Sequence, residues 1–120
     1  MTFRFNRPKY HAVPTKLDGF TFASKAEAEY YAYLCLLKRT GNVLHVDVHP
    51  VFTLGPGDKV RLDFLVWYED GVVVGIDVKG AQRTKAASEF RRMAKRWNHP
   101  AVTLKAVCKK GKAWVDWMVP

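Results

Sequence analysis

The residues best suited to chemistry stand at the end of a run of β-branched residues, GVVVGIDVKG at positions 71–80. This run is typical of a β-strand, and a strand sends successive side chains to opposite faces of its sheet. Asp77 and Lys79 are two residues apart, so their side chains are expected on the same face. A carboxylate beside an ammonium group is either a surface ion pair or half of a catalytic site, and the neighbouring elements decide which.

A second carboxylate is brought to this pair by the hairpin that closes at residues 69–71, Glu-Asp-Gly. A two-residue loop would pair Asp63 with Val78, so that Asp63 and Asp77 face opposite sides of the sheet and one enters the core. A three-residue loop, with Gly71 in the left-handed conformation, places Asp63 directly opposite Asp77, with Cβ atoms about 5 Å apart. Because burying a lone carboxylate is costly, we prefer the three-residue loop. It also collects an apolar set on the other face: Leu62, Phe64, Val66, Ile76 and Val78.

Two carboxylates side by side repel each other unless a cation lies between them. Lys79 supplies one positive charge, and a divalent metal would supply more. Hard oxygen ligands suit Mg²⁺, which proteins typically hold with one or two carboxylates together with waters and phosphate oxygens. A lysine beside such a metal can orient the attacking water and stabilise developing negative charge. The residue types therefore predict metal-assisted hydrolysis of a phosphodiester.

Composition agrees with a polyanionic partner. The chain has 120 residues, which is the size of one domain, and 20 Lys and Arg residues against 11 Asp and Glu residues give it a net charge of +9. Such a charge favours nucleic acid as the partner. Its longest apolar run is far shorter than the roughly 20 residues of a membrane-spanning helix, and its first residues lack the apolar stretch of a secretory signal. We therefore expect no membrane association and interpret Cys35 and Cys108 as reduced core thiols.

The elements that must position these residues can be read along the chain. Residues 1–19 are interpreted as a basic N-terminal arm, and residues 20–120 as a single domain. Ser24 is the expected N-cap of a first helix whose segment 30–37 is apolar on most sides, which predicts that it is well buried. A strand over 43–54, interrupted at Pro50, then precedes the hairpin over 59–80. A second helix over 84–98 is predicted to present an apolar face formed by Ala86, Phe90, Met93, Ala94 and Trp97.

Two short strands, over 101–107 and 112–119, complete the chain. The order is α-β-β-β-α-β-β. It predicts a mixed central β-sheet flanked by helices, in the α/β or α+β class.

Asp63 in LDF and the pair Asp77 and Lys79 in IDVKG resemble the motif of the PD-(D/E)XK nuclease superfamily. Leu62 stands where that superfamily usually has a proline. The resemblance widens over nearly the whole chain, because KYHAVPTKLDGFTFASKAEAEYYAYL, HPVFTL and DFLVWYEDGVVVGIDVKG are similar to a family of small, mostly uncharacterised phage and prophage proteins placed in the superfamily. It implies a restriction-endonuclease-like core of helix, three strands, helix and strand.

The resemblance also implies a role for each residue. Asp63 and Asp77 would bind the metal, the carbonyl of Val78 would assist them, and Lys79 would act on the attacking water. Glu27, in the first helix, would support the metal or the water. From the residues alone, Glu27 is the capping-box partner of Ser24, and this interpretation remains open beside the other.

Basic residues of the second predicted helix are the first candidates for DNA contact. That helix directly follows the strand that bears Asp77, so its first turn is expected beside the metal site. A charged helix face is often only solvated, but we expect contacts with DNA from Arg83, Lys85, Arg91, Arg92, Lys95 and Arg96. Further candidates are Arg4, Arg7 and Lys9 in the arm and Lys109, Lys110 and Lys112 in the last turn.

Three other residues form a second possible metal site, which has less support. His45, Asp47 and His49 alternate along one predicted strand, but no motif accompanies them, and a polar strand face is the favoured interpretation.

These observations predict a metal-dependent DNA endonuclease that uses Mg²⁺, with Mn²⁺ expected to substitute. The resemblance implies structure-selective or junction-resolving cleavage in phage DNA metabolism, in the cytoplasm of a bacterial host. A small domain with one site cuts two strands most readily as a homodimer. The alternative is a non-catalytic nucleic-acid-binding or assembly protein that keeps the nuclease fold, and the complete set of carboxylates and lysine argues against it.

Overall fold

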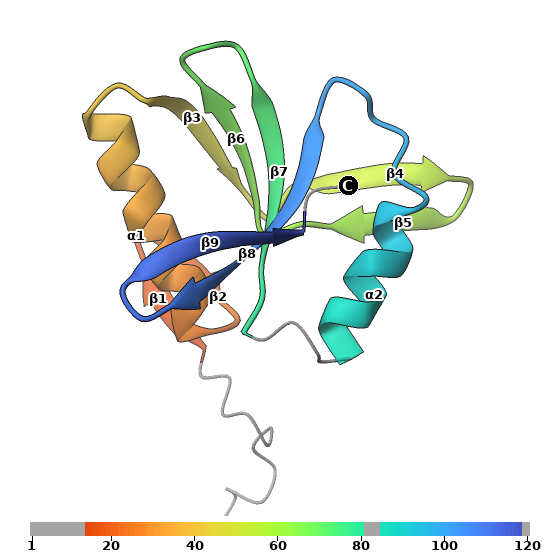
Figure 1. The fold of residues 1–120 in the computed structure, drawn as a ribbon, viewed down its shortest axis with the longest axis horizontal. Helices are drawn as coiled ribbons and strands as arrows, with labels where there is room; N and C mark the ends of the chain where they lie inside the picture. The colour runs from red at the N-terminus through yellow and green to blue at the C-terminus, as the bar shows by residue number, and fades with distance from the viewer. Residues whose placement is uncertain (1–13, 81–84, 119–120) are drawn as a thin grey trace, which may run out of the picture.

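The computed structural model describes residues 14–80 and 85–118 (Figure 1). This part of the chain forms an α+β fold in which a five-stranded mixed sheet has the strand order β3-β6-β7-β8-β9. Two further pairs of strands, β1-β2 and β4-β5, form separate small sheets. The elements are β1 (Thr15–Leu17), β2 (Phe20–Phe22), α1 (Lys25–Arg39), β3 (Val43–Val48), β4 (Val51–Gly55), β5 (Asp58–Arg61), β6 (Phe64–Tyr68), β7 (Val73–Val78), α2 (Lys85–Ala94), β8 (Thr103–Lys110) and β9 (Ala113–Met118).

Helix α1 begins where the sequence predicts. Ser24 has extended backbone angles, and its Oγ accepts a hydrogen bond from the Glu27 N–H at 3.2 Å. The expectation that residues 30–37 are well buried is wrong in part, because Tyr33 and Leu36 are 38% and 47% exposed. The helix lies on one face of the sheet, so only the side that carries Tyr30 and Leu34 is covered.

The segment that precedes α1 is more regular than the sequence indicates. Residues 15–17, expected within an irregular arm, form β1 and pair with β2. Phe22, at the end of β2, is fully buried under the first turns of α1, where its ring lies 5.3 Å from that of Tyr31. This hairpin therefore closes one end of the main core, and the remainder of the predicted arm, residues 1–13, lies outside the described residues.

Strands β3 to β6 form one long antiparallel ribbon with a bend in its middle. The register that pairs Val48 with Phe64 continues through Val51 and Arg61 to Thr53 and Lys59. At the bend, the His49 N–H donates to the Asp63 carbonyl at 2.9 Å and the Leu62 N–H donates to the Pro50 carbonyl at 3.0 Å. His49 has a positive φ of 57°, and Pro50 follows it. The predicted interruption at Pro50 is thus confirmed, and it divides each arm of the ribbon into two strands.

The hairpin between β6 and β7 has the three-residue register. Phe64 pairs with Ile76 and Val66 with Val74, and the Tyr68 N–H donates to the Val72 carbonyl at 2.9 Å. Gly71 closes the turn with φ at 91°, a conformation that favours glycine because it lacks a Cβ atom. The prediction from side-chain parity is confirmed, and it places Asp63 and Asp77 at the same end of the two strands.

Two apolar clusters lie on the two faces of the sheet, one under each helix. Phe64, Val66, Ile76 and Val78 share one face as predicted, and they pack in the cluster under α1, but Leu62 belongs to the cluster under α2. The bend between Leu62 and Asp63 rotates the ribbon, which is why the alternation of faces does not continue through it.

Helix α2 connects β7 to β8, which lie side by side and parallel. Phe90 and Met93 are buried as predicted, but Ala87 faces the core in place of Ala86, which is exposed. The helix ends at Ala94, earlier than predicted, and Trp97 packs on the same cluster from the segment after it. No helix among the described residues is long and apolar enough to span a membrane.

Candidate functional site

The carboxylates of Asp63 and Asp77 each accept a hydrogen bond from a backbone N–H on the opposite arm of the hairpin. The Asp63 N–H donates to Oδ1 of Asp77 at 3.0 Å, and the Val78 N–H donates to Oδ2 of Asp63 at 2.7 Å. The regular ladder of β6 and β7 ends one residue earlier, at Phe64 and Ile76. The Asp63 N–H also donates to the Ile76 carbonyl at 3.2 Å, so the two side chains add to the backbone hydrogen bonds at the strand ends, and together these bonds fix both carboxylates there.

Lys79 completes the group that the sequence analysis places here. Its Nζ lies 3.3 Å from Oδ2 of Asp77, and both side chains are mostly buried, with 17% and 12% of their surface exposed. The ammonium also lies 5.7 Å from the ring centroid of Phe90 in α2, a cation–π contact. Its backbone N–H donates to the Val107 carbonyl at 2.8 Å, so the neighbouring parallel strand anchors the residue.

Glu27 serves as a helix cap and also faces the aspartates. Its Oε2 accepts a hydrogen bond from the Ala23 N–H at 3.3 Å, while its own N–H is bound by Ser24. The residue is buried, with 9% of its surface exposed, and its carboxylate interacts electrostatically with Asp77 and Asp63. The two interpretations of Glu27 are thus compatible, because the first turn of α1 abuts the ends of β6 and β7.

Crowding of these carboxylates changes their acidity. Burial, together with the charges of Asp77 and Glu27, raises the pKa of Asp63 to about 8. Burial likewise raises the pKa of Glu27, which the Ala23 amide and the nearby cations oppose. A carboxyl group whose pKa is raised in this way is stabilised by a proton or by another cation.

The donor set suits Mg²⁺. Asp63 and Asp77 offer hard carboxylate oxygens, and burial together with two neighbouring carboxylates raises the pKa of Asp63, so an added cation would be favourable here. Across the described ranges, no group of three or more His, Cys, Asp and Glu side chains is arranged to hold a metal ion. Two aspartates are nevertheless enough for Mg²⁺, which is usually bound by one or two carboxylates and completes its coordination with waters and substrate phosphates.

Two residues that the sequence analysis did not place here lie beside the cluster. The charge of Arg61, at the end of β5, acts on both Glu27 and His49. His49 lies at the bend of the ribbon, next to Asp63 through its backbone, and its Nε2 is buried without a hydrogen-bond partner. Burial is the main reason that the pKa of His49 is lowered, with the charge of Arg61 adding to it. The sequence signal for Arg61 was its position as a basic residue two residues before Asp63.

The trio of His45, Asp47 and His49 does not form a metal site in the described part of the chain. His45 and Asp47 bond to each other at 2.8 Å on an exposed strand face, and His49 contacts Phe22 beyond the end of β3. The favoured interpretation, a polar strand face, agrees with this arrangement.

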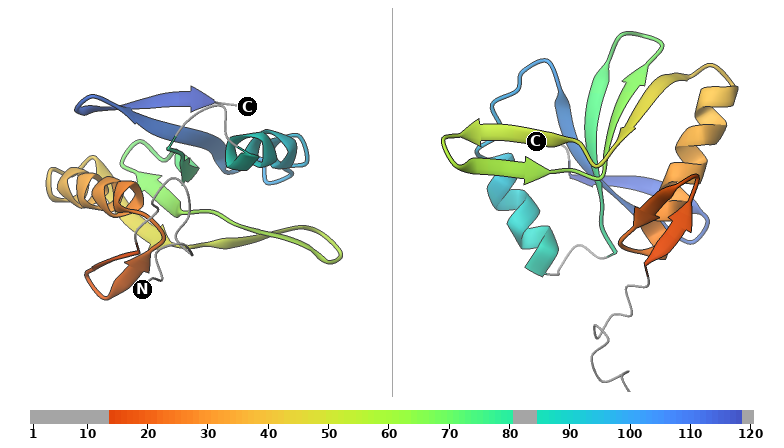
Figure 2. Two further views of the ribbon diagram at one scale, coloured as in Figure 1. Left: turned by 90° about the horizontal axis from the view of Figure 1, so that it is seen from below. Right: turned by 180° about the vertical axis from the view of Figure 1, so that it is seen from behind.

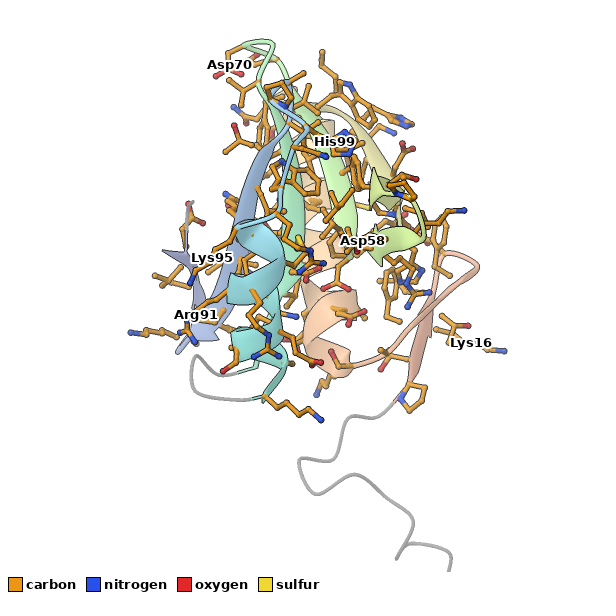
Figure 3. All side chains as sticks on the ribbon, turned by 90° about the vertical axis from the view of Figure 1, so that its right-hand side faces the viewer. Lys16, Asp58, Asp70, Arg91, Lys95 and His99 are labelled. Carbon is orange, nitrogen blue, oxygen red and sulfur yellow. The ribbon has the colours of Figure 1, made fainter. Side chains whose placement is uncertain are left out.

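The predicted DNA-binding residues of the second helix differ in their surroundings. Lys85, Arg92 and Lys95 are exposed, Arg91 is partly buried, and Arg83 lies outside the described residues. Arg96 lies beyond the end of α2, and its guanidinium binds the Asp58 carboxylate with two hydrogen bonds, at 3.0 and 3.2 Å. In Figure 3, Arg91 and Lys95 extend from one side of the helix and Asp58 lies on the other.

Among the other basic candidates, Arg4, Arg7 and Lys9 lie outside the described residues. Lys109 forms an ion pair with Glu29 at 3.0 Å, while Lys110 and Lys112 are exposed at the turn between β8 and β9. Glu29, which shares the first turns of α1 with Glu27, is thereby engaged away from the aspartates.

Comparison with known proteins gives one family. No curated protein and no solved structure matches this sequence. A family profile matches residues 7–114, which is most of the chain, and that family is described as a protein of unknown function, DUF1064. The chain therefore belongs to the DUF1064 family.

Proposed function

We propose that this protein is a metal-dependent DNA endonuclease that hydrolyses phosphodiester bonds. The observation that carries the proposal is the pair Asp63 and Asp77, whose carboxylates are fixed on adjacent strand ends with the Lys79 ammonium 3.3 Å from one of them. A surface ion pair does not need two adjacent carboxylates, one buried and one half-buried, and their cost in stability suggests a functional reason for keeping them.

The order of elements supports a restriction-endonuclease-like core. Helix α1, strands β3, β6 and β7, helix α2 and the parallel strand β8 follow one another as the resemblance to PD-(D/E)XK nucleases implies. The carboxylates lie at the end of β7 that leads to α2, where a phosphate could approach both the aspartates and the cations around them.

Asp63 and Asp77 would hold Mg²⁺, or Mn²⁺ in its place, with the Val78 carbonyl as a further ligand and Glu27 as support. The bound metal would polarise the phosphodiester and lower the pKa of a water molecule. Lys79 is held by Asp77 and Phe90 so that its ammonium remains at the site, where it would orient the attacking water and stabilise charge on the phosphate. Glu27 would accept a proton or orient the water through its second oxygen.

The resemblance to phage and prophage proteins implies the biological context. The protein would act on structured DNA, such as junctions, during phage DNA metabolism in the cytoplasm of a bacterial host. Two copies would cut the two strands of a duplex, because each copy carries one pair of aspartates.

A nuclease panel tests the proposal. Linear duplex, single-stranded, flap and four-way junction DNA are incubated with the purified protein and with Mg²⁺ or Mn²⁺. We expect cleavage of at least one form, and a loss of about 10²-fold or more in turnover for Lys79→Ala, because one preorganised charge stabilises the transition state by this order. Equal cleavage by the wild type and Lys79→Ala would indicate a contaminating nuclease, and no cleavage of any form with either metal would overturn the proposal.

A further inference from the structure

The β4–β5 hairpin begins and ends at the carboxylate cluster. Its two strands join the main sheet through the bend of the ribbon, where His49 bonds to Asp63 and Leu62 bonds to Pro50. From this root the hairpin projects away from the five-stranded sheet on the side of α2 (Figure 2). Any ligand that reaches the aspartates along this side must pass close to the hairpin.

One face of the hairpin is fixed to α2 and the segment after it. Leu54, Phe52 and Val60 pack in the cluster that contains Phe90 and Met93. The bidentate pair of Asp58 and Arg96 adds a polar link. Two further hydrogen bonds run from Asn98 Nδ2 to the Leu54 carbonyl at 3.0 Å and between His99 Nε2 and the Thr53 carbonyl at 2.9 Å. These contacts hold the hairpin in one orientation, and Asp58 and His99 are visible on this side in Figure 3.

The opposite face carries positive charge. Lys59 and Arg61 are both exposed, and they alternate with the inward-facing Val60 and Asp58. Their cross-strand neighbours, Thr53 and Val51, carry no charge. Within the described part of the chain, neither the Lys59 ammonium nor the Arg61 guanidinium has a hydrogen bond or ion pair. Since Arg96 neutralises Asp58, Lys59 and Arg61 give the hairpin its positive charge.

These charges form a line that leads out from the cluster. Arg61 is close enough to affect the ionisation of both Glu27 and His49. Lys59 is two strand residues farther on, which corresponds to about 7 Å. Three crowded carboxylates repel a polyanion, so an incoming phosphate backbone is held only where nearby cations offset that repulsion.

We propose that the outer face of the β4–β5 hairpin, through Lys59 and Arg61, binds the phosphate backbone of DNA next to the phosphodiester held at Asp63 and Asp77. This inference rests on the proposed function and adds a DNA contact that the second helix does not provide. The competing explanation is that the two charges only prevent the exposed hairpin from pairing with other strands, as charged residues do on many sheet edges.

The experiment measures DNA affinity over a salt series in Ca²⁺, with a fluorescently labelled duplex and a labelled four-way junction. The variants are Lys59→Ala, Arg61→Ala and the double variant. Each substitution is expected to lower the slope of log affinity against log salt by about 1, and the double variant by about 2, because each removes one phosphate contact. Both side chains are exposed, so the melting temperature of each variant should stay close to that of the wild type.

A matched control removes the same charges elsewhere. Lys38 and Arg39 are exposed in the last turn of α1, roughly 18 Å along the helix from Glu27. The double variant Lys38→Ala/Arg39→Ala is expected to leave the slope close to that of the wild type. If it lowers the slope as much as the hairpin variant does, the effect comes from net charge and the inference is wrong.

The remaining outcomes separate the hairpin from the proposed function. If the wild type cleaves DNA, Lys79→Ala does not, and the hairpin double variant keeps wild-type affinity and slope, then the hairpin inference alone is overturned. If the wild type neither binds nor cleaves any DNA form, the proposed function fails and the hairpin inference fails with it.

Discussion

Asp63 shows most clearly what the crowding of charges means at the scale of single residues. Its carboxylate is held by the Val78 amide, which favours the ionised form, yet burial and two neighbouring carboxylates raise its pKa to about 8. The protein thus keeps a carboxyl group that is easier to protonate than in the unfolded chain. Metal binding would reverse this preference, because a divalent cation stabilises the ionised form.

The first prediction concerns pH and metal. A group with a raised pKa in the folded state stabilises the fold at low pH, and this contribution is lost as the pH rises from about 4 towards 8. Without metal, the contribution of Asp63 should therefore fall over this window, by about 1.4 kcal/mol for each pKa unit separating the folded and unfolded states. Thermal unfolding from roughly pH 4.5 to roughly pH 8.5 measures this loss of stability. Asp63→Asn is the variant that lacks the titrating group.

Mg²⁺ should counteract the loss. Its stabilising effect on the wild type is expected to grow with pH, because it competes with the proton for the same carboxylate. A wild-type curve that parallels that of Asp63→Asn throughout, both without metal and with it, would contradict this account.

The second prediction concerns Asp77→Asn. Asparagine can still accept the hydrogen bond from the Asp63 N–H, and it removes one of the crowded negative charges, so the apo protein should fold and melt within a few degrees of the wild type. Cleavage should be abolished, because the amide is a poor substitute for a metal-binding carboxylate. Melting curves are measured beside the cleavage assay on the same preparation, and a well-folded variant that still cleaves DNA would show that Asp77 is not a metal ligand.

At the scale of elements, the turn between β6 and β7 determines where the two aspartates lie. Gly71, with φ at 91°, supplies the third residue of the turn. A turn one residue shorter would shift the register and move every side chain of one strand to the other face. The conformation of one glycine is thus connected to the arrangement of Asp63 and Asp77 at the far end of the hairpin.

The third prediction tests this turn. Gly71→Ala should destabilise the fold by about 1–2 kcal/mol, because an L-residue is strained in the left-handed region. Gly71→Asn should cost less, since asparagine tolerates this conformation better. Gly80→Ala is the control, because Gly80 lacks a positive φ and a Cβ there would contact nothing within 4 Å. Denaturant unfolding measures all three, and equal effects of Gly71→Ala and Gly80→Ala would argue against strain at the turn.

At the scale of the whole molecule, some of the basic residues that give the net charge of +9 are already paired with acidic residues. Arg96, Lys105 and Lys109 are engaged in ion pairs with Asp58, Asp116 and Glu29. The exposed charges of α2, by contrast, lie on its surface away from the hairpin. Lys59 and Arg61 lie on the face of the β4–β5 hairpin opposite α2, so the charges of α2 and those of the hairpin point away from each other.

The fourth prediction concerns α2. Arg92→Ala/Lys95→Ala should lower the slope of log affinity against log salt by about 2 if both side chains contact phosphates. Affinity in Ca²⁺ is measured as for the hairpin, with Lys38→Ala/Arg39→Ala as the control of equal charge. An unchanged slope would mean that α2 presents a solvated face, and that DNA binds through the hairpin, the turn at Lys110 and Lys112, or the N-terminal segment.

Local rules allowed much of the fold and of the candidate site to be predicted from the sequence. The Ser24 cap depends on residues within one helical turn, and the register that brings Asp63 to Asp77 depends on a three-residue turn and on strand parity. Lys79 follows from the same parity, because it is two residues from Asp77 on the same strand. These features involve few residues that are near in sequence, so propensity and alternation are sufficient to specify them.

Only the tertiary structure decided what happens at the bend of the ribbon. The rotation at His49 and Asp63 sends Leu62 to the cluster under α2, although strand alternation alone predicts that Leu62 lies with Phe64. Likewise, Arg96 was predicted to contact DNA, but its partner Asp58 is 38 residues away in the chain. Such contacts form because packing of the hairpin on α2 brings distant segments together, and a sequence pattern that describes one element at a time does not contain that information.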